Sequence, residues 1–112
     1  MNKQYRLKKT FEIEKLFKKR QSVGNMYFAI YYDNISEDIS KIAFSVSKKI
    51  GNAVVRNKEK RILREIMRNN LGKIMGLKIL IVERKDALNI SFDQKQKEII
   101  RLLEKINKKR RK

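Results

Sequence analysis

Hydrophobic residues recur along this chain with two spacings, one typical of helices and one typical of strands. Apolar residues three and four positions apart predict helices over residues 10–19, 53–70 and 91–107. Runs rich in aromatic and β-branched residues predict strands over residues 25–32, 40–47 and 77–83. Gly51 and Asn52 precede the middle helix, and Ser91 and Gln94 have the spacing of a capping box at the start of the last one.

The strand predicted over residues 40–47 alternates between two kinds of side chain. Its large apolar residues point to one side, at Ile42, Phe44 and Val46. Its small or polar residues point to the other, at Ala43, Ser45 and Ser47. The first side should face a core, and the second leaves room for a ligand. The sheet is therefore expected to be open on one face.

The order of elements is helix, strand, strand, an optional further strand, helix, strand and helix, which predicts an α+β fold, a small two-layer α/β sandwich. We expect the helices over residues 53–70 and 91–107 to cover one face, and the N-terminal helix to flank a groove on the other. Residues 1–112 form one domain, with a basic arm at residues 1–9 and a basic tail, disordered in the absence of an anion, at residues 108–112.

The middle helix carries its basic side chains on one side. At 100° per residue, an arc of about 140° holds Arg56, Asn57, Lys60, Arg61, Arg64 and Arg68. The complementary arc holds Val55, Ile62, Leu63, Ile66 and Met67. Glu59 and Glu65 are expected to pair with basic residues of the same helix. A cationic strip of this kind fits a phosphate backbone, although a solvated amphipathic helix has the same pattern.

Composition favours a polyanionic partner. The chain has 30 Lys and Arg against 12 Asp and Glu, a net charge of +18, and this charge repels itself unless an anion binds. The absence of Cys and His excludes disulfides, thiolate nucleophiles, His-based acid–base catalysis and the usual zinc sites. No apolar run is long enough for a signal peptide or a membrane span, so a cytoplasmic protein without membrane contact is expected.

Catalysis by the protein itself has little support, because the acidic residues are dispersed and the four glycines match no nucleotide fingerprint. Nucleic-acid binding has more support from the sequence. The first strand carries Tyr27, Ala29 and Tyr31 on one side, and Phe28, Ile30 and Tyr32 on the other. One set must be core, and the other, beside Phe17, could stack on unpaired bases or simply pack.

Two segments resemble a known family. They are KIAFSVSKKIGNAVVRNKEKRILRE at residues 41–65 and RLKKTFEIEKLFK at residues 6–18. Together they resemble the signature of the bacterial ribonuclease P protein family. The resemblance implies an α/β sandwich with a left-handed crossover. It also implies a protein that is not itself the catalyst: a large RNA holds the active site and most of the Mg²⁺, and cleaves precursor tRNA. The protein, expected to be monomeric when free, binds that ribonuclease P RNA and holds the 5′ leader of the precursor tRNA in a cleft.

The resemblance also assigns roles to individual residues. The residues implied to bind RNA are Lys48, Lys49, Arg56, Asn57, Lys58, Lys60, Arg61, Arg64 and Arg68. The residues implied to line the leader cleft are Ile13, Phe17, Tyr31, Ser45 and Ser47. No catalytic residue and no certain metal ligand on the protein is implied. Two positions depart from the family pattern: Ile13 stands where Phe is common, and Lys58 replaces an Arg, with Glu59 adding negative charge beside it.

Three other functions predict different behaviour. A small RNA-binding protein of the ribosome has a similar composition but lacks the signature run. A nucleoid-type DNA-binding protein should bind plain duplex DNA as well as it binds RNA with a single-stranded leader. A protein-only nuclease should cleave without an RNA subunit and lose activity when one carboxylate is changed.

Overall fold

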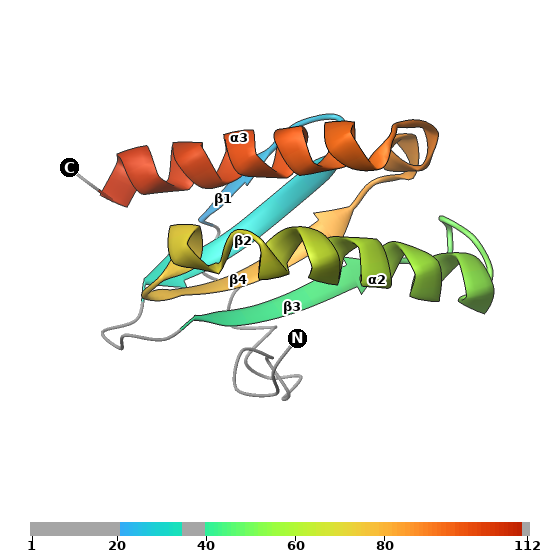
Figure 1. Ribbon diagram of the computed structural model, residues 1–112, viewed down its shortest axis with the longest axis horizontal. Helices are drawn as coiled ribbons and strands as arrows, with labels where there is room; N and C mark the ends of the chain where they lie inside the picture. Colours follow the sequence, from blue (N-terminus) through green and yellow to red (C-terminus); the bar gives the residue numbers. More distant parts are fainter. Residues whose placement is uncertain (1–20, 35–39, 111–112) are drawn as a thin grey trace.

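The computed structural model describes residues 21–34 and 40–110, so the predicted arm and N-terminal helix lie outside the described residues. The strands are β1 (Ser22–Gly24), β2 (Phe28–Asn34), β3 (Lys41–Val46) and β4 (Leu77–Glu83). The helices are α2 (Ala53–Arg68) and α3 (Phe92–Arg110), with short 3-10 turns η2 (Leu71–Ile74) and η3 (Lys85–Asn89) on either side of β4 (Figure 1). The predicted α+β architecture is confirmed.

The four described strands form one sheet in the order β1-β2-β4-β3. β2 pairs antiparallel with both β1 and β4, whereas β3 and β4 are parallel neighbours. The chain passes from β3 to β4 through α2, which lies in front of the sheet in Figure 1. Seen in that view the crossover is left-handed, as the family resemblance implies and against the usual right-handed rule.

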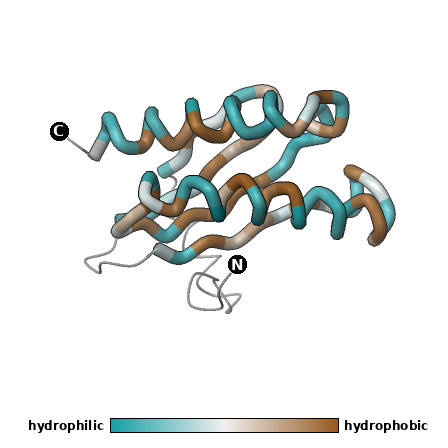
Figure 2. Tube along the Cα trace, viewed as in Figure 1, coloured by the Kyte–Doolittle hydropathy of each residue, from teal (hydrophilic) through white to brown (hydrophobic). Residues whose placement is uncertain are grey.

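Both helices cover the same face of the sheet (Figure 1), which confirms the placement expected for these two helices. The core between the layers is mostly apolar, and the facing sides of helices and strands are largely hydrophobic in Figure 2. From the helices it includes Leu63, Ile66, Met67, Ile99, Leu102, Leu103 and Ile106. From the sheet it includes Phe28, Ile30, Tyr32, Ile42, Val46, Ile79 and Ile81. Burial of these side chains is the main source of stability.

Side-chain caps begin both helices where the sequence predicts. The Asn52 Oδ1 atom accepts a hydrogen bond from the Val55 N–H at 3.1 Å, and the Ser91 Oγ atom accepts one from the Gln94 N–H at 3.2 Å. Gly51 is needed just before the first cap, because a Cβ atom there would lie 2.9 Å from the Val55 side chain.

The first predicted strand begins three residues too early. Asn25 forms a turn in which its Oδ1 atom accepts hydrogen bonds from the Tyr27 and Phe28 N–H groups, both at 2.9 Å. This turn joins the short β1 to β2, so Tyr27 lies outside the strand and packs against the main core. The placement of Tyr27 on the same side as Tyr31 was therefore wrong, and the side carrying Phe28 is core.

The last helix is longer than predicted. α3 continues to Arg110, so Lys108 and Lys109 are helical, and a disordered tail beginning at Lys108 was a wrong prediction. Lysines in the final turn interact favourably with the negative end of the helix dipole, which explains why the helix extends through them.

Candidate nucleic-acid interface

The polar side of α2 faces outward, as predicted. Asn57, Lys58, Arg61 and Arg68 are exposed. Arg56, Lys60 and Arg64 are half-buried, and none of the seven is buried. The opposite side packs on the sheet. The helix therefore presents a row of cations, and this geometry permits contact with a phosphate backbone.

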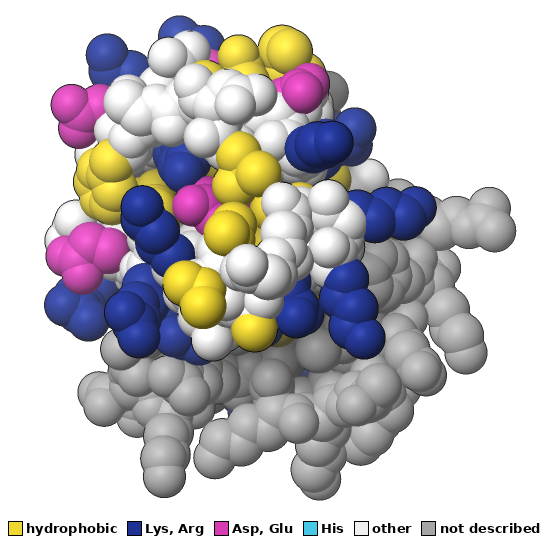
Figure 3. All heavy atoms as spheres, turned by 90° about the vertical axis from the view of Figure 1, so that its right-hand side faces the viewer, with side chains coloured by type: hydrophobic (Ala, Val, Ile, Leu, Met, Phe, Trp, Pro, Cys, Tyr) yellow, Lys and Arg dark blue, Asp and Glu magenta, His cyan; other side chains and the backbone are white. Residues whose placement is uncertain are grey.

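Lys48 and Lys49 extend this charge beyond the helix. Both are exposed in the turn that follows β3, which is closed by a 3.0 Å hydrogen bond from the Ile50 N–H to the Ser47 carbonyl oxygen. The turn leads directly into α2, so both lysines lie at its N-terminal end (Figure 1). Seen from that end, Lys and Arg side chains surround hydrophobic ones and do not form a single block (Figure 3).

The two acidic residues of α2 behave differently. Glu65 pairs with Arg68 at 3.2 Å on the helix surface, as predicted, and such an exposed pair contributes little to stability. Glu59 makes no such pair: it is 5% exposed and accepts a 2.8 Å hydrogen bond from the Lys95 ammonium of α3. The expectation that Glu59 adds negative charge to the strip was wrong. It lies at about 300° from Arg56, inside the apolar arc, and this position was a signal of its burial.

A second carboxyl group, that of Glu83, is buried at the end of β4. Neither of its oxygens has a hydrogen-bond partner among the described residues. Burial and, after it, the neighbouring Glu59 carboxyl group raise the pKa of Glu83 to about 8, although Lys95 partly opposes them. Since ionised carboxylates only accept hydrogen bonds, the two carboxyl groups can bond to each other only when one holds a proton. Sequence reasoning missed this group, although the alternation of β4 places Glu83 on the same face as the core residues Ile79 and Ile81.

The face of the sheet away from α2 and α3 carries the described members of the predicted cleft. Tyr31 and Ala43 both pair with Leu80, and Ser45 pairs with Val82 in the next row. Tyr31 and Ser45 are half-buried, and Ser47 is exposed just beyond β3. Ile13 and Phe17, the other predicted cleft residues, lie outside the described residues.

The expectation of an open face needs correction. At the centre of this face, Leu80 is 1% exposed and Ala43 9% exposed. They form a small second apolar cluster, with Tyr31 and Val82 packed against it. The alternation in β3 identified the correct face, but small side chains there allow close packing and do not guarantee an empty surface.

Two lysines on this face were missed by sequence reasoning. Lys41 of β3 lies directly beside Lys78 of β4 in the parallel register, one row beyond Ala43 and Leu80. Extending the alternation of β3 back by one step, from Ala43 to Lys41, would have placed the first lysine on this face. They lie at the opposite end of the face from Ser45 and Ser47. Asp33 of β2 pairs with Lys78 in the same row and offsets part of their positive charge.

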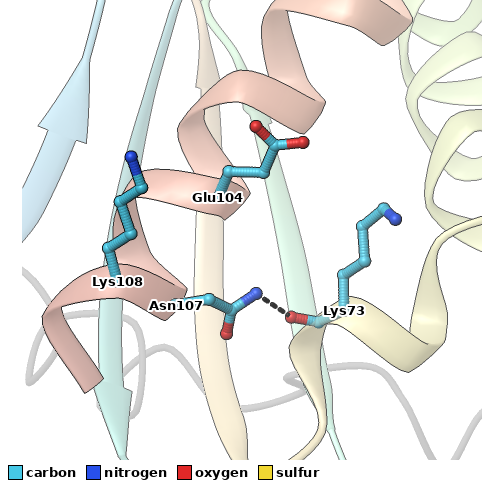
Figure 4. A pocket seen from close by; sticks show the side chains of 4 residues that line it. All are labelled: Lys73, Glu104, Asn107 and Lys108. Atoms are coloured by element: carbon cyan, nitrogen blue, oxygen red, sulfur yellow. Dashed lines mark hydrogen bonds between the residues drawn. The ribbon is translucent and has the colours of Figure 1, made fainter. Parts of the chain in front are cut away.

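A separate hollow lies near the end of α3, with a volume of about 250 Å³. It is lined by Lys73, Glu104, Asn107 and Lys108, and the Asn107 amide donates a 3.0 Å hydrogen bond to the Lys73 carbonyl oxygen across it (Figure 4). It contains none of the predicted RNA-binding residues, and its carboxylate offsets part of its positive charge.

Within residues 21–34 and 40–110, no three Asp or Glu side chains come together as metal ligands. In the same part of the chain, neither helix has the length and apolar character needed to cross a membrane.

Comparison with known proteins gives consistent results. The family model described as Ribonuclease P matches residues 1–107. The ribonuclease P protein component of Bacillus pumilus is 40% identical over 107 residues, which cover 94% of this chain and 90% of that protein. The corresponding protein of Mycoplasma mycoides is 37% identical over 102 residues, which cover 89% of this chain and 94% of that protein.

Solved structures agree with the sequence matches. The structure of the Staphylococcus aureus RNase P protein superposes with a TM-score of 0.82 at 36% identity, covering 89% of this chain and 93% of that one. The RNase P protein from Thermotoga maritima also gives 0.82, at 31% identity, covering 89% of this chain and 96% of that one. Sequence and fold thus agree over nearly the full length of each relative.

Proposed function

Because the chain belongs to the ribonuclease P protein family, we propose that it binds the catalytic RNA of ribonuclease P and the 5′ leader of precursor tRNA, and so promotes maturation of the tRNA 5′ end. The observation that carries the proposal is the outward row of cations on α2 next to Lys48 and Lys49. In this proposal the chemistry takes place on the RNA, as the family resemblance implies.

The physical role is to hold two polyanions together. The catalytic RNA and its substrate repel each other, and a protein of charge +18 between them lowers that repulsion. Its contacts lie away from the scissile bond, so they increase substrate affinity and retention of Mg²⁺ more than they alter the chemical step. Mg²⁺ would be bound mainly by RNA phosphates; no three acidic side chains gather as ligands in the described part of the protein.

The leader would follow the sheet face that carries Tyr31, Ser45 and Ser47. Tyr31 offers a ring for stacking, and the serine hydroxyls offer hydrogen bonds to phosphate or base. Lys41 and Lys78 lie on the same face and would contact phosphates at its other end. The proposal is supported by the exposure of Ser47 and the partial exposure of Tyr31 and Ser45.

Reconstitution with bacterial ribonuclease P RNA tests this function. Cleavage of precursor tRNA at low Mg²⁺ concentration should increase when the protein is added to the RNA, and the protein alone should cleave nothing. No gain in cleavage would reject the proposal. Metal-dependent cleavage by the protein alone would instead support a protein nuclease, and equal affinity for plain duplex DNA would support a nucleoid role.

Replacing Tyr31 with Ala should weaken binding of precursor tRNA by about 1–3 kcal/mol, the usual contribution of one stacked base. Binding of mature tRNA, which has no leader, should be nearly unchanged. Tyr31→Phe keeps the ring and should behave like the unmodified protein. Dissociation constants of holoenzymes reconstituted with each variant measure the effect, and an equal loss for both RNAs would contradict a role in leader binding.

A further inference from the structure

The first half of α2, which carries five of its seven predicted RNA-binding residues, has one side chain that is fully buried. The buried residues of α2 are Glu59, Leu63, Ile66 and Met67. Glu59 is therefore the single buried side chain in the ten residues Ala53–Ile62, while Val54 in the same stretch is 77% exposed. Apolar side chains that are fully buried anchor the second half of the helix. In the first half, Val55 and Ile62 pack against the core but are only partly buried, so the Glu59 carboxylate is its deepest attachment.

That carboxylate is held by the other helix. The Lys95 ammonium lies 2.8 Å from the Glu59 Oε1 atom, and both side chains are 6% exposed. Lys95 is itself fixed near the start of α3, where its N–H donates to the Ser91 carbonyl oxygen at 2.9 Å. The ion pair thus joins α2 to the capped first turn of α3. Removing one partner of a buried ion pair strongly destabilises the protein, because the remaining partner keeps an uncompensated charge.

Glu83 completes the cluster from the end of β4, where it is 3% exposed. Among the described residues, the charged groups that act on its carboxyl are Glu59 from α2 and Lys95 from α3. One ammonium cannot neutralise two carboxylates, so with both ionised the cluster would carry a buried negative charge. A proton on one carboxyl group removes that charge and supplies the donor that the Glu83 oxygens otherwise lack.

We propose that Glu59 and Lys95 are positioning residues that hold the first half of α2 in place, and that a proton on the Glu83 carboxyl group keeps this buried link neutral. The inference rests on the proposed function only in assigning RNA to this half of the helix. The residues around Glu59 on the outer side, including Arg56, Lys60 and Arg61, owe their fixed orientation to it. The Arg56 Nε atom, one turn before Glu59, is itself buried.

Lys95→Met tests the link, because it removes the ammonium and keeps the apolar stem. Amide hydrogen exchange in residues 53–62 should become at least about tenfold faster, while exchange in residues 63–68 should change little. Affinity for ribonuclease P RNA should fall about tenfold. Lys105→Met removes an exposed lysine from the same helix and should do neither. Uniformly faster exchange across the protein would overturn the proposal, because it would indicate only general destabilisation.

Two more variants make the test independent of folding defects and of the RNA assignment. Glu59→Gln keeps the size of the side chain and should fold even if Lys95→Met does not. It should speed up amide hydrogen exchange in residues 53–62 to a smaller extent. The double variant Glu59→Leu with Lys95→Met replaces the pair by apolar contact and should restore slow exchange and RNA affinity. Failure to restore both would overturn the proposal. If Arg61→Ala lowers the affinity for RNA but Lys95→Met does not, the proposed positioning role of Lys95 is rejected. If neither variant lowers the affinity, α2 is not the RNA-binding surface and the proposed function is rejected instead.

Discussion

Affinity for ribonuclease P RNA is expected to fall by about 10³–10⁵ when the salt concentration rises from 50 to 200 mM, as for a protein that makes 6–10 phosphate contacts. The cations proposed to make these contacts are Lys48, Lys49, Arg56, Lys58, Lys60, Arg61, Arg64 and Arg68. Each contact releases counterions from the RNA, and dissolved salt opposes that release. Arg68 should contribute least, since it already pairs with Glu65.

Single substitutions make this prediction specific. Arg61→Ala and Arg64→Ala should each reduce the slope of log affinity against log salt concentration by slightly less than one, with little change in the free energy of unfolding. Lys109→Ala removes an exposed cation from the far end of α3 and should leave the slope unchanged. Filter binding over a salt series measures the slope. A flat curve, or an equal effect of Arg61→Ala and Lys109→Ala, would show that phosphate contacts on α2 do not dominate binding.

Replacing Glu83 with Gln should change how stability depends on pH. The pKa of this carboxyl rises from an ordinary 4.5 to about 8 in the folded protein. Between these pH values the folded state holds a proton that the unfolded chain has lost. The contribution of Glu83 to stability is therefore complete below about pH 4.5 and is lost as the pH rises towards 8. Relative to Glu83→Gln, the unfolding equilibrium constant of the unmodified protein should rise by up to about tenfold per pH unit, or about 400-fold in total from pH 5 to pH 8.

Urea unfolding of both proteins at a series of pH values gives this difference directly, and other titrating groups cancel in the comparison. Above about pH 8 the two curves should run parallel, because both the folded and unfolded states are then ionised at this group. Glu104→Gln removes an exposed carboxyl of α3 and serves as the control, with no comparable trend. Carbon-13 spectra of the glutamate carboxyl groups provide a second measurement. If every glutamate titrates below pH 6, Glu83 is not a buried acid.

Most of the described fold could be predicted from hydrophobic spacing because the core is built from regular patterns. The faces of β3, α2 and α3 followed from residues such as Phe44, Leu63 and Leu102. The start of α3 followed from the cap predicted at Ser91, and the start of α2 from the break at Gly51 and Asn52. The outward direction of the α2 cations followed from the same spacing. By contrast, the start of β2 depends on hydrogen bonds that Asn25 accepts from the Tyr27 and Phe28 N–H groups, which hydrophobic spacing does not reveal.

The errors in the site have a common physical cause. A charged residue on an apolar face is ordinarily treated as exposed, but Glu59 and Lys95 neutralise each other from helices that the sequence does not place side by side. Burial of Leu80 on the second sheet face also depends on neighbours brought together only by the fold. The handedness of the crossover came from family resemblance, because a hydrophobic pattern is the same for either hand.

The order of strands has a consequence for synthesis on the ribosome. β4 lies between β2 and β3, yet it is the last strand in the chain, so an emerging polypeptide that ends before Leu77 lacks the strand that both neighbours require. The core side of α3, ending at Ile106, appears later still. A nascent chain therefore cannot complete this sheet until the residues up to Glu83 have left the exit tunnel. Until then its apolar strands are available to chaperones.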